Sequence, residues 1–501
     1  MIDQGTTVNL TNITFRNGYT TPTPYSLITA RYAGTVVNIE GCEFYNNSGL
    51  KGGVLAVTSG AIVNINNSTF HNNSAILITS EGGVLWVYEG TVNITNSYFY
   101  NNSACDGGAI KIGYASNVYI ENTTFFNNTA YNTTISYGGG GAINSNSNLD
   151  IYNCTFIENY ADLNGGAIYV NSGKTTVVKS LLLNNRIAGV GDKQGSTFAS
   201  DSRQTIDLTV NYSIIISNDT HSPISITTDY NENNTVNLEY NYWGTNSKIL
   251  STSNNNYINR VIIKGYLNET PASVNYLEDL TIKFVGYNST DGEFTLEQSV
   301  HDYDLNLSTL IGNVDPPTIT IKDNVANAKY YSNQTGNENI TMTNDEGLRY
   351  VLSFEVLGEI IKQDTQLNGS NVEMYYLDGS QYIVKLTTTN GTPVSNSNIT
   401  VVLNNQTYIL VTDENGAATI PLDLIDGTYE VTSSFNGDRY YNAADSITNT
   451  IVIKPIDTNV VVTANNITRG EPASIIATIN NTGFNGPVTF TINATNYYAN
   501  A

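Results

Sequence analysis

Short runs of alternating apolar and polar residues fill the first half of the chain, and the runs recur at intervals of 26 to 33 residues. Each run leads to a large apolar residue, which we call the anchor. The positions seven and five places before the anchor are apolar in almost every repeat, and the position between these two is mostly polar. The anchors are Phe15, Phe44, Phe70, Phe99, Phe125, Phe156, Leu182, Ile215 and Trp243. Alternation with a period of two is the pattern of a β-strand, and self-similarity at a fixed period indicates a repeat fold.

A glycine pair opens a second alternating run in several repeats, as in Gly107-Gly108 before Ala109-Ile110. The outer positions of this run are expected to be Ala56, Trp86, Lys111, Asn144 and Tyr169. Each repeat therefore predicts three short strands that stack on the same strands of the next repeat. No repeat has room for a crossover helix, so the coil itself must connect parallel strands, and such connections are right-handed. We predict an all-β protein with a right-handed parallel β-helix over residues 1–250.

Asparagine recurs where the chain must turn between strands. Asn12, Asn67, Asn96, Asn122 and Asn153 lie three places before an anchor, and asparagine tolerates the left-handed backbone conformation of a tight corner. A second column follows the anchors, and its members are Asn47, Asn73, Asn102, Asn128, Asn159, Asn185 and Asn218. Stacked at about 4.8 Å, the amides of this column should hydrogen-bond from one rung to the next.

Two motifs repeated in register carry a family resemblance. Gly107-Gly108-Ala109-Ile110 followed by Phe125-Phe126-Asn127-Asn128 resembles the GGAI/FxxN repeat of the polymorphic outer-membrane proteins of chlamydiae. The same repeat is common in adhesin-like surface proteins of methanogenic archaea, and Asn241-Tyr242-Trp243-Gly244 looks like the close of the helix in that group. The resemblance covers residues 1–250 and implies a secreted protein of the cell surface.

Strand patterns of a different kind follow the repeats. Alternation in segments such as Leu280–Phe284 predicts a diverged immunoglobulin-like β-sandwich over 258–357, and short strands separated by turns predict a second sandwich over 362–454. The stretch Ile399–Asn404 recurs as Val488–Asn493, so residues 455–501 are interpreted as a truncated copy of the same repeat. We therefore expect a fragment of a longer protein, with its signal and anchor outside this chain.

Charge and composition narrow the possible partners. The 501 residues include 21 basic and 44 acidic side chains, a formal net charge of −23. Such a chain argues against nucleic acid or an anionic membrane as partner and for a solvated extracellular surface. No run of eighteen apolar residues occurs, so we expect no membrane insertion within this chain. Cys42 and Cys154 are interpreted as small core residues, and the scattered histidines indicate neither a metal nor a cofactor.

An enzyme is the alternative function, because parallel β-helices also host polysaccharide lyases and glycoside hydrolases. Those reactions need clustered carboxylates, for calcium or for acid and base catalysis. The best candidates are Glu81 and Asp106. Both occupy the position just before the glycine pair of their repeat, and Lys51 and Asn164 occupy the same position in other repeats. A solvated loop end explains the same residues, and we expect no catalytic site.

One outward column offers a functional surface. The residues directly after the first seven anchors are Arg16, Tyr45, His71, Tyr100, Phe126, Ile157 and Leu183. Because the anchors point inward, strand alternation places this column outside. A contiguous exposed stripe of aromatic residues is a contact surface, unless variable loops or a neighbouring segment cover it.

We select Tyr45, His71, Tyr100 and Phe126 as candidate ligand-binding residues. Stacked rings would suit sugars or a protein surface, and His71 would add a hydrogen bond. The sequence thus predicts a non-enzymatic, adhesin-like protein of the extracellular cell surface. A β-helix rod on an immunoglobulin-like stalk would bind glycans or surface proteins of other cells.

Overall fold

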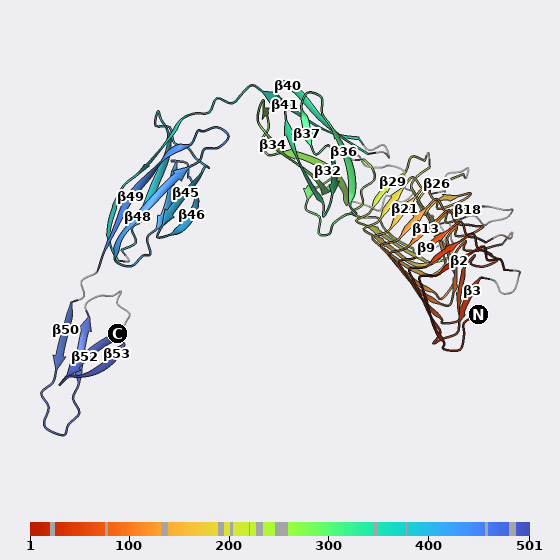
Figure 1. The fold of residues 1–501 in the computed structure, drawn as a ribbon, viewed down its shortest axis with the longest axis horizontal. Coiled ribbons are helices and arrows are strands. Elements are labelled where there is room, and N and C mark those ends of the chain that lie inside the picture. Colours follow the sequence, from red (N-terminus) through yellow and green to blue (C-terminus); the bar gives the residue numbers. More distant parts are fainter. Residues whose placement is uncertain are drawn as a thin grey trace. The chain divides into compact units, whose positions relative to one another are not determined.

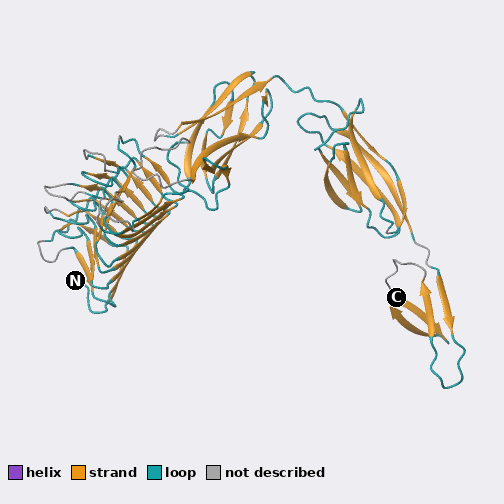
Figure 2. Cartoon of the chain, turned by 180° about the vertical axis from the view of Figure 1, so that it is seen from behind, coloured by secondary structure: helices purple, strands orange, loops and turns teal. Residues whose placement is uncertain are grey.

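The computed structural model describes residues 1–20, 26–75, 79–131, 139–188, 195–200, 204–219, 221–226, 234–245, 259–344, 349–376, 378–455, 459–479 and 487–500. All regular elements of these residues are β-strands, which confirms the predicted all-β class (Figure 1, Figure 2). The chain divides into two compact units, Met1–Gly358 and Glu359–Ala501.

The N-terminal coil is a parallel β-helix, as predicted, with neighbouring rungs in each sheet joined in register. Sheet 1 consists of β1 (Thr7–Thr11), β4 (Val36–Glu40), β8 (Ile62–Asn66), β12 (Thr91–Thr95), β16 (Asn117–Glu121), β20 (Asn148–Tyr152), β24 (Gly173–Val178), β28 (Ile206–Asn211) and β31 (Thr235–Asn237). Sheet 2 consists of β2 (Thr14–Arg16), β5 (Glu43–Tyr45), β9 (Thr69–His71), β13 (Tyr98–Tyr100), β17 (Thr124–Phe126), β21 (Thr155–Ile157), β25 (Leu181–Leu183) and β29 (Ile214–Ile216).

Two further sheets complete each turn of the coil. Sheet 3 contains the two-residue strands β6 (Ser48–Gly49), β10 (Ser74–Ala75), β14 (Ser103–Ala104), β18 (Thr129–Ala130), β22 (Tyr160–Ala161) and β26 (Arg186–Ile187). Sheet 4 contains β3 (Ile28–Arg31), β7 (Leu55–Thr58), β11 (Leu85–Tyr88), β15 (Ile110–Ile112), β19 (Ile143–Ser145), β23 (Ile168–Val170), β27 (Phe198–Ser200) and β30 (Ile224–Ile226). The alternation predicted sheets 1, 2 and 4; it missed sheet 3, because strands of two residues are too short to show a period.

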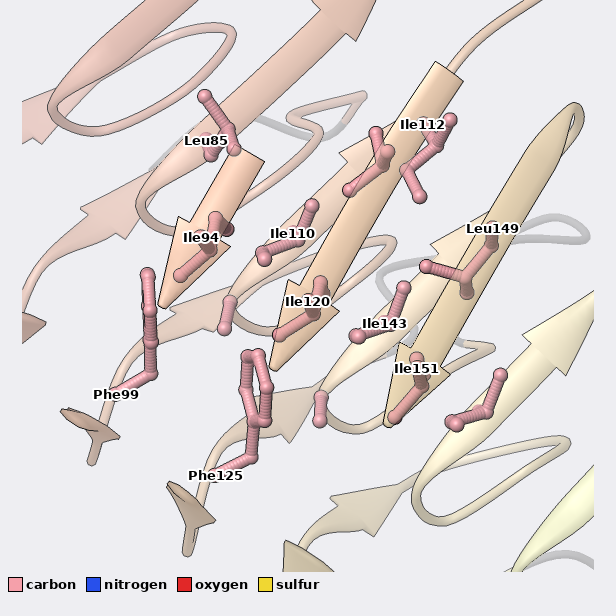
Figure 3. Packing of buried hydrophobic residues seen from close by; sticks show 14 of the residues in the cluster. Leu85, Ile94, Phe99, Ile110, Ile112, Ile120, Phe125, Ile143, Leu149 and Ile151 are labelled. Atoms are coloured by element: carbon pink, nitrogen blue, oxygen red, sulfur yellow. The ribbon is translucent and has the colours of Figure 1, made fainter. Parts of the chain in front are cut away.

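The predicted inward columns form one continuous apolar core (Figure 3). In sheet 1, Val92 pairs with Val63 and Val118, and every one of these side chains is buried. In sheet 2 the phenylalanine anchors stack ring on ring, with centroids 4.7 to 5.0 Å apart from Phe15 to Phe156. The stack follows from strand spacing, because parallel strands about 4.8 Å apart bring identical side chains into contact.

Asparagine makes the corners and an internal ladder. The corner residues predicted from the sequence have φ between 47° and 54°, in the left-handed region. Inside the coil, Asn102 Nδ2 donates to Asn128 Oδ1 at 3.0 Å, and Asn73 Nδ2 donates to Asn102 Oδ1 at 3.1 Å. The same pattern links each neighbouring pair from Asn47 to Asn185, so the predicted amide ladder is confirmed over these rungs. Asn218, which the spacing adds to the column, is exposed instead.

The glycine pair is required by close approach of neighbouring rungs. Gly107 has a φ of +64°, and a Cβ on Gly108 would lie 2.1 Å from the carbonyl oxygen of Gly141. No side chain fits at that distance, so the second glycine lets the turn pack against the next rung.

The cysteines lie inside the protein, and none of the three forms a disulfide bond. Cys42 and Cys154 are core residues, as predicted, and burial raises the pKa of the Cys154 thiol to about 12. Cys105 follows β14 and is buried as well.

A two-sheet β-domain follows the coil within the first unit. One sheet has the order β32-β34-β39-β37 with β35 beside β34, and the other the order β33-β41-β40-β36-β38. Their bounds are β32 (Asn259–Leu267), β33 (Ala272–Ser273), β34 (Glu278–Asn288), β35 (Gly292–Phe294), β36 (Tyr303–Ser308), β37 (Asn313–Asp315), β38 (Thr318–Ile321), β39 (Val325–Tyr331), β40 (Gly336–Thr343) and β41 (Arg349–Leu357). Pairing is antiparallel except between β33 and β41.

The Asn241–Gly244 motif joins this domain to the coil. Trp243 packs into the core of the β-helix, whereas its neighbour Tyr242 packs into the core of the two-sheet domain, 5.4 Å from the ring of Phe284. Asn241 accepts a hydrogen bond from the Ser213 backbone at 2.9 Å. Alternating side chains of one short segment therefore close one core and begin the next. The end of the predicted helix, residues 246–250, and residue 258 lie outside the described residues.

The second unit contains another two-sheet domain and two hairpins. The domain has the sheets β42-β44-β47 and β43-β49-β48-β45-β46. The strands of the unit are β42 (Thr365–Gly369), β43 (Val372–Tyr375), β44 (Gln381–Thr388), β45 (Asn398–Leu403), β46 (Gln406–Val411), β47 (Ala417–Pro421), β48 (Gly427–Phe435), β49 (Ala444–Lys454), β50 (Val460–Ala464), β51 (Ile475–Ile479), β52 (Pro487–Ile492) and β53 (Thr495–Asn500). The hairpins β45–β46 and β52–β53 both turn through two residues of positive φ, at Asn404-Asn405 and Asn493-Ala494.

Candidate functional site

The outward stripe of sheet 2 is an ordered stack of rings. Tyr45 and His71 lie parallel with centroids 5.0 Å apart, and His71 and Tyr100 follow at 4.7 Å. Phe126 continues the column in register with Tyr100. All four side chains are half-buried, and the adjacent Tyr98 adds a ring 4.8 Å from Tyr100 that is more exposed. The structure therefore brings together the four residues selected from the sequence, on the outer face of β5, β9, β13 and β17.

Polar groups border this stack at its N-terminal end. Arg16 Nη1 donates to the Tyr45 hydroxyl at 3.1 Å, and this hydrogen bond raises the pKa of the guanidinium. His71 Nε2 lies 3.3 Å from Glu43 Oε1, and its Nδ1 lies 3.2 Å from Asn72 Nδ2. Partial burial, with the nearby Glu43 carboxylate, raises the pKa of Tyr100. The rings thus offer flat apolar faces with fixed hydrogen-bonding edges, an arrangement that suits an amphipathic ligand.

The two-sheet domain covers the other end of the same stripe. Leu183 and Ile216 are buried in the core of that domain, and Ile157 packs against it. The change from aromatic to aliphatic residues along the column therefore has a structural cause. The aliphatic end is an internal interface, whereas the aromatic end at Tyr45, His71, Tyr100 and Phe126 retains exposure. Sequence reasoning treated the stripe as a single surface and did not identify this division.

The carboxylates considered for catalysis lie on adjacent rungs, as predicted, because Glu81 forms isolated bridges with both Lys51 and Asp106. Each carboxylate, however, has a cation of its own: Glu81 Oε2 lies 3.0 Å from Lys51 Nζ, and Asp106 Oδ2 lies 2.8 Å from Lys111 Nζ. Asp106 is buried, so the interpretation of these residues as a solvated loop end is wrong for that position. Asn164 lies in the same column two rungs further on, where it bridges Gly139, and it does not contribute a carboxylate.

Some of the residues expected to point outward from sheet 4 lie under cover. Lys111 and Asn144 are 6% and 1% exposed, and Ala56 is buried too. Asp106, which directly precedes the glycine pair of its rung, lies over this face and accepts a hydrogen bond from Lys111. Sequence reasoning missed this cluster because alternation gives the direction of a side chain but not what packs over it. The only sign of the cluster in the sequence was that Lys111 and Asn144 occupy neighbouring positions of one outward column.

A second feature missed by sequence reasoning is an open polar groove of about 200 Å³ over sheet 1. Its lining includes Asn93, Tyr119, Asp150 and Lys174. Tyr119 donates its hydroxyl to Glu121 at 2.9 Å, and burial together with this bond raises its pKa to about 12. Among the described residues, neither the Asp150 carboxylate nor the Lys174 ammonium has an ion-pair partner.

Within the described ranges, no group of three or more His, Cys, Asp or Glu side chains is arranged to hold a metal ion. No helix among the described residues has the length and apolar character needed to span a membrane.

A match to a protein-family model covers most of the coil. Residues 1–202 match the family described as right handed beta helix region. No curated protein matches the chain. Three solved structures show low similarity to this chain. They are the fibronectin(III)-like modules of Clostridium thermocellum CbhA (12% identity, 38% of this chain and 95% of that chain, TM-score 0.23), the adhesin InvE of Yersinia pseudotuberculosis (11% identity, 37% of this chain and 58% of that chain, TM-score 0.15) and invasin, a bacterial integrin-binding protein (17% identity, 46% of this chain and 49% of that chain, TM-score 0.16). The family match and the sheet topology together identify the N-terminal part of this chain as a right-handed parallel β-helix.

Proposed function

We propose that this chain is part of an adhesin-like protein of the cell surface, which binds its partner through the outer stripe of sheet 2 and carries out no reaction on it. The observation that carries this proposal is the parallel stack of Tyr45, His71 and Tyr100, half-exposed on an outer face. Contiguous aromatic surface of this kind is uncommon on a soluble protein without a contact role. The flat faces suit pyranose rings of glycans, and the polar edges suit their hydroxyl groups.

The rigidity of the coil supports the same proposal. Strand pairing in register and the internal amide ladder hold the rings in one geometry before a ligand arrives. A preorganised surface loses little conformational entropy on binding, so even shallow contacts give useful affinity. The net charge of −23 keeps the surface solvated and supports a location outside the cell. The partners in this proposal are glycans or surface proteins of other cells.

Removing two rings of the stripe should weaken adhesion without unfolding the coil. We expect the double variant Tyr100→Ala, Phe126→Ala to bind glycan arrays and whole cells at least about tenfold more weakly, because two lost anchor rings cost about 2 kcal/mol or more. Binding is measured with the 501-residue chain, and its melting midpoint checks the fold.

Tyr152→Ala is the matched control for this experiment. Tyr152 is an outward tyrosine of the neighbouring sheet 1 and is 40% exposed. Its removal should leave adhesion unchanged if the stripe is the site. Full adhesion by the double variant would show that the partner binds elsewhere on the protein.

The competing function is a β-helix polysaccharide lyase or glycoside hydrolase that uses Glu81 and Asp106. The separate ion pairs of these carboxylates support the non-enzymatic proposal, because each charge is already neutralised by a lysine. We expect no cleavage of acidic or neutral polysaccharides by the chain, and no change in Glu81→Gln. Reproducible cleavage that disappears in Glu81→Gln would replace the adhesin proposal by an enzymatic function.

A further inference from the structure

Four side chains stand in register along the outer face of sheet 4. Trp86 pairs with Lys111, Lys111 with Asn144, and Asn144 with Tyr169, on successive strands β11, β15, β19 and β23. The amine and the amide are therefore direct neighbours between two aromatic rings. The ring of Tyr169 lies on the backbone of Gly139, where a Cβ would come within 2.5 Å of it.

Lys111, Asn144 and Asp106 form a closed ring of hydrogen bonds. Lys111 Nζ donates to Asn144 Oδ1 at 2.6 Å and to Asp106 Oδ2 at 2.8 Å. Asn144 Nδ2 donates to the second carboxylate oxygen, Asp106 Oδ1, at 2.6 Å. All three residues are buried, with 6%, 1% and 6% of Lys111, Asn144 and Asp106 exposed. One carboxylate thus touches both nitrogens of an amine–amide pair in a site shielded from water.

We propose that Lys111 and Asn144 join spontaneously in an isopeptide bond, with Asp106 as the catalytic proton carrier. The proposal does not depend on the adhesive function, because it rests on the contacts of this buried cluster alone.

The reaction is a transamidation that needs no oxidant, reductant or external reactant. Asp106 Oδ2 takes a proton from the Lys111 ammonium, which frees the amine lone pair and removes two opposite charges from a buried site. After rotation of the amine about the Cε–Nζ bond, Nζ forms a bond to Asn144 Cγ, and the carbonyl electrons move to Oδ1. The Cγ–Nδ2 bond then breaks. Nδ2 takes the proton from Asp106 and leaves as ammonia while the C=O bond to Oδ1 re-forms. The ammonia then takes one of the two protons on Nζ and departs as ammonium, which leaves a neutral amide and an ionised Asp106.

A fourth residue completes the catalytic arrangement. Asn171 Nδ2 donates to Asn144 Oδ1 at 3.0 Å, where negative charge develops in the tetrahedral intermediate. Asn146 Oδ1 accepts from both Lys111 Nζ at 3.1 Å and Asn171 Nδ2 at 3.0 Å, and so holds the nucleophile and the oxyanion donor in place. Fixed reactants of this kind reach effective molarities of about 10⁵ M or more, which compensates for the low reactivity of an amide.

The bond would connect adjacent rungs. Lys111 belongs to β15 and Asn144 to β19, which otherwise are held together by backbone hydrogen bonds and side-chain packing. A covalent link across sheet 4 would keep these rungs paired when the coil is pulled or locally opened.

Mass spectrometry of the 501-residue chain tests the proposal directly. We expect the intact mass to be lower than the sequence mass by one ammonia molecule. After denaturation, a glutamate-specific protease that cuts behind Glu121 should leave the peptides containing Lys111 and Asn144 joined as one branched species. A full sequence mass with two separate peptides would overturn the proposal and leave the cluster as a satisfied buried ion pair.

Three variants identify the chemistry. Lys111→Arg and Asp106→Asn should each show their full sequence mass. The first variant lacks the nucleophilic amine, and the second lacks the carboxylate that carries the proton. Lys174→Arg, at an exposed lysine of sheet 1, should keep the loss of ammonia. A wild-type mass deficit that persists in Lys111→Arg would place the reaction at another residue and would contradict the assignment. The wild-type measurement stands even if a variant fails to fold.

Discussion

Replacement of Phe99 by alanine should lower the free energy of unfolding of the coil by about 3–5 kcal/mol. Phe99 is fully buried, with the rings of Phe70 and Phe125 stacked at 4.7 and 5.0 Å on its two sides. The substitution removes a ring from the middle of a continuous column, and the neighbouring rungs cannot close the cavity because backbone pairing fixes their spacing. Thermal or denaturant unfolding measures the change.

Tyr100→Ala is the matched control, because it removes an aromatic ring from the same strand on the opposite face. Tyr100 is half-buried, so its loss should cost no more than about 1 kcal/mol. Equal destabilisation by the two substitutions would show that the phenylalanine column is not the main source of stability in this rung. The unfolding measurement on Tyr100→Ala also serves the adhesion experiment, because it shows whether a loss of binding is accompanied by a loss of stability.

Asn102→Leu should cost roughly 2–5 kcal/mol, although leucine has a similar volume and is more apolar. The Asn102 side chain is fully buried. Its Oδ1 accepts from the backbone N–H of Asn73 at 3.0 Å, and its Nδ2 donates to the carbonyl of Phe70 at 2.9 Å. Leucine can replace neither bond, so buried backbone groups of two rungs lose their partners. Unfolding by denaturant gives the free-energy change.

Asn93→Leu provides the control for that measurement. Asn93 belongs to the same rung and also donates to an asparagine of the preceding rung, Asn64, at 2.8 Å. Its ladder lies on the outer face of sheet 1, where water can replace the lost bond. We expect a change below about 1 kcal/mol. A comparable effect of the two substitutions would mean that the internal ladder stabilises the coil no more than a surface contact does.

The isopeptide proposal bears on the design of all these experiments. A covalent link between β15 and β19 would resist reduction and denaturant, so unfolding of the neighbouring rungs would be measured against a restrained chain. The unfolding free-energy change caused by Phe99→Ala should therefore be measured in both the wild-type and the Lys111→Arg backgrounds. The difference between the two values would show how much the covalent link contributes to the stability of these rungs.

The β-helix was predictable from the sequence because its constraint is local and repeated. Strand alternation sets which side chains point inward, and stacking in register sets which of them touch, so Phe70, Phe99 and Phe125 could be placed without coordinates. The asparagine corners were predictable for a similar reason, since few residues tolerate a left-handed backbone. The register of Glu81 beside Asp106 followed from the same spacing.

The repeat, the inward or outward direction of side chains in sheets 1, 2 and 4, and the residues of the outer stripe thus follow from the sequence alone. Only the tertiary structure decided which outward residues remain accessible. Leu183 is covered by a domain more than 70 residues away in the chain, and Lys111 by Asp106 from the approach to its own turn. The alternation of apolar and polar residues shows which face of a strand a side chain lies on. Whether that side chain is buried depends on contacts with other segments, and the distance in sequence to those segments follows no regular period. For that reason the half-exposed rings and the buried amine–amide pair became distinguishable only in the folded chain.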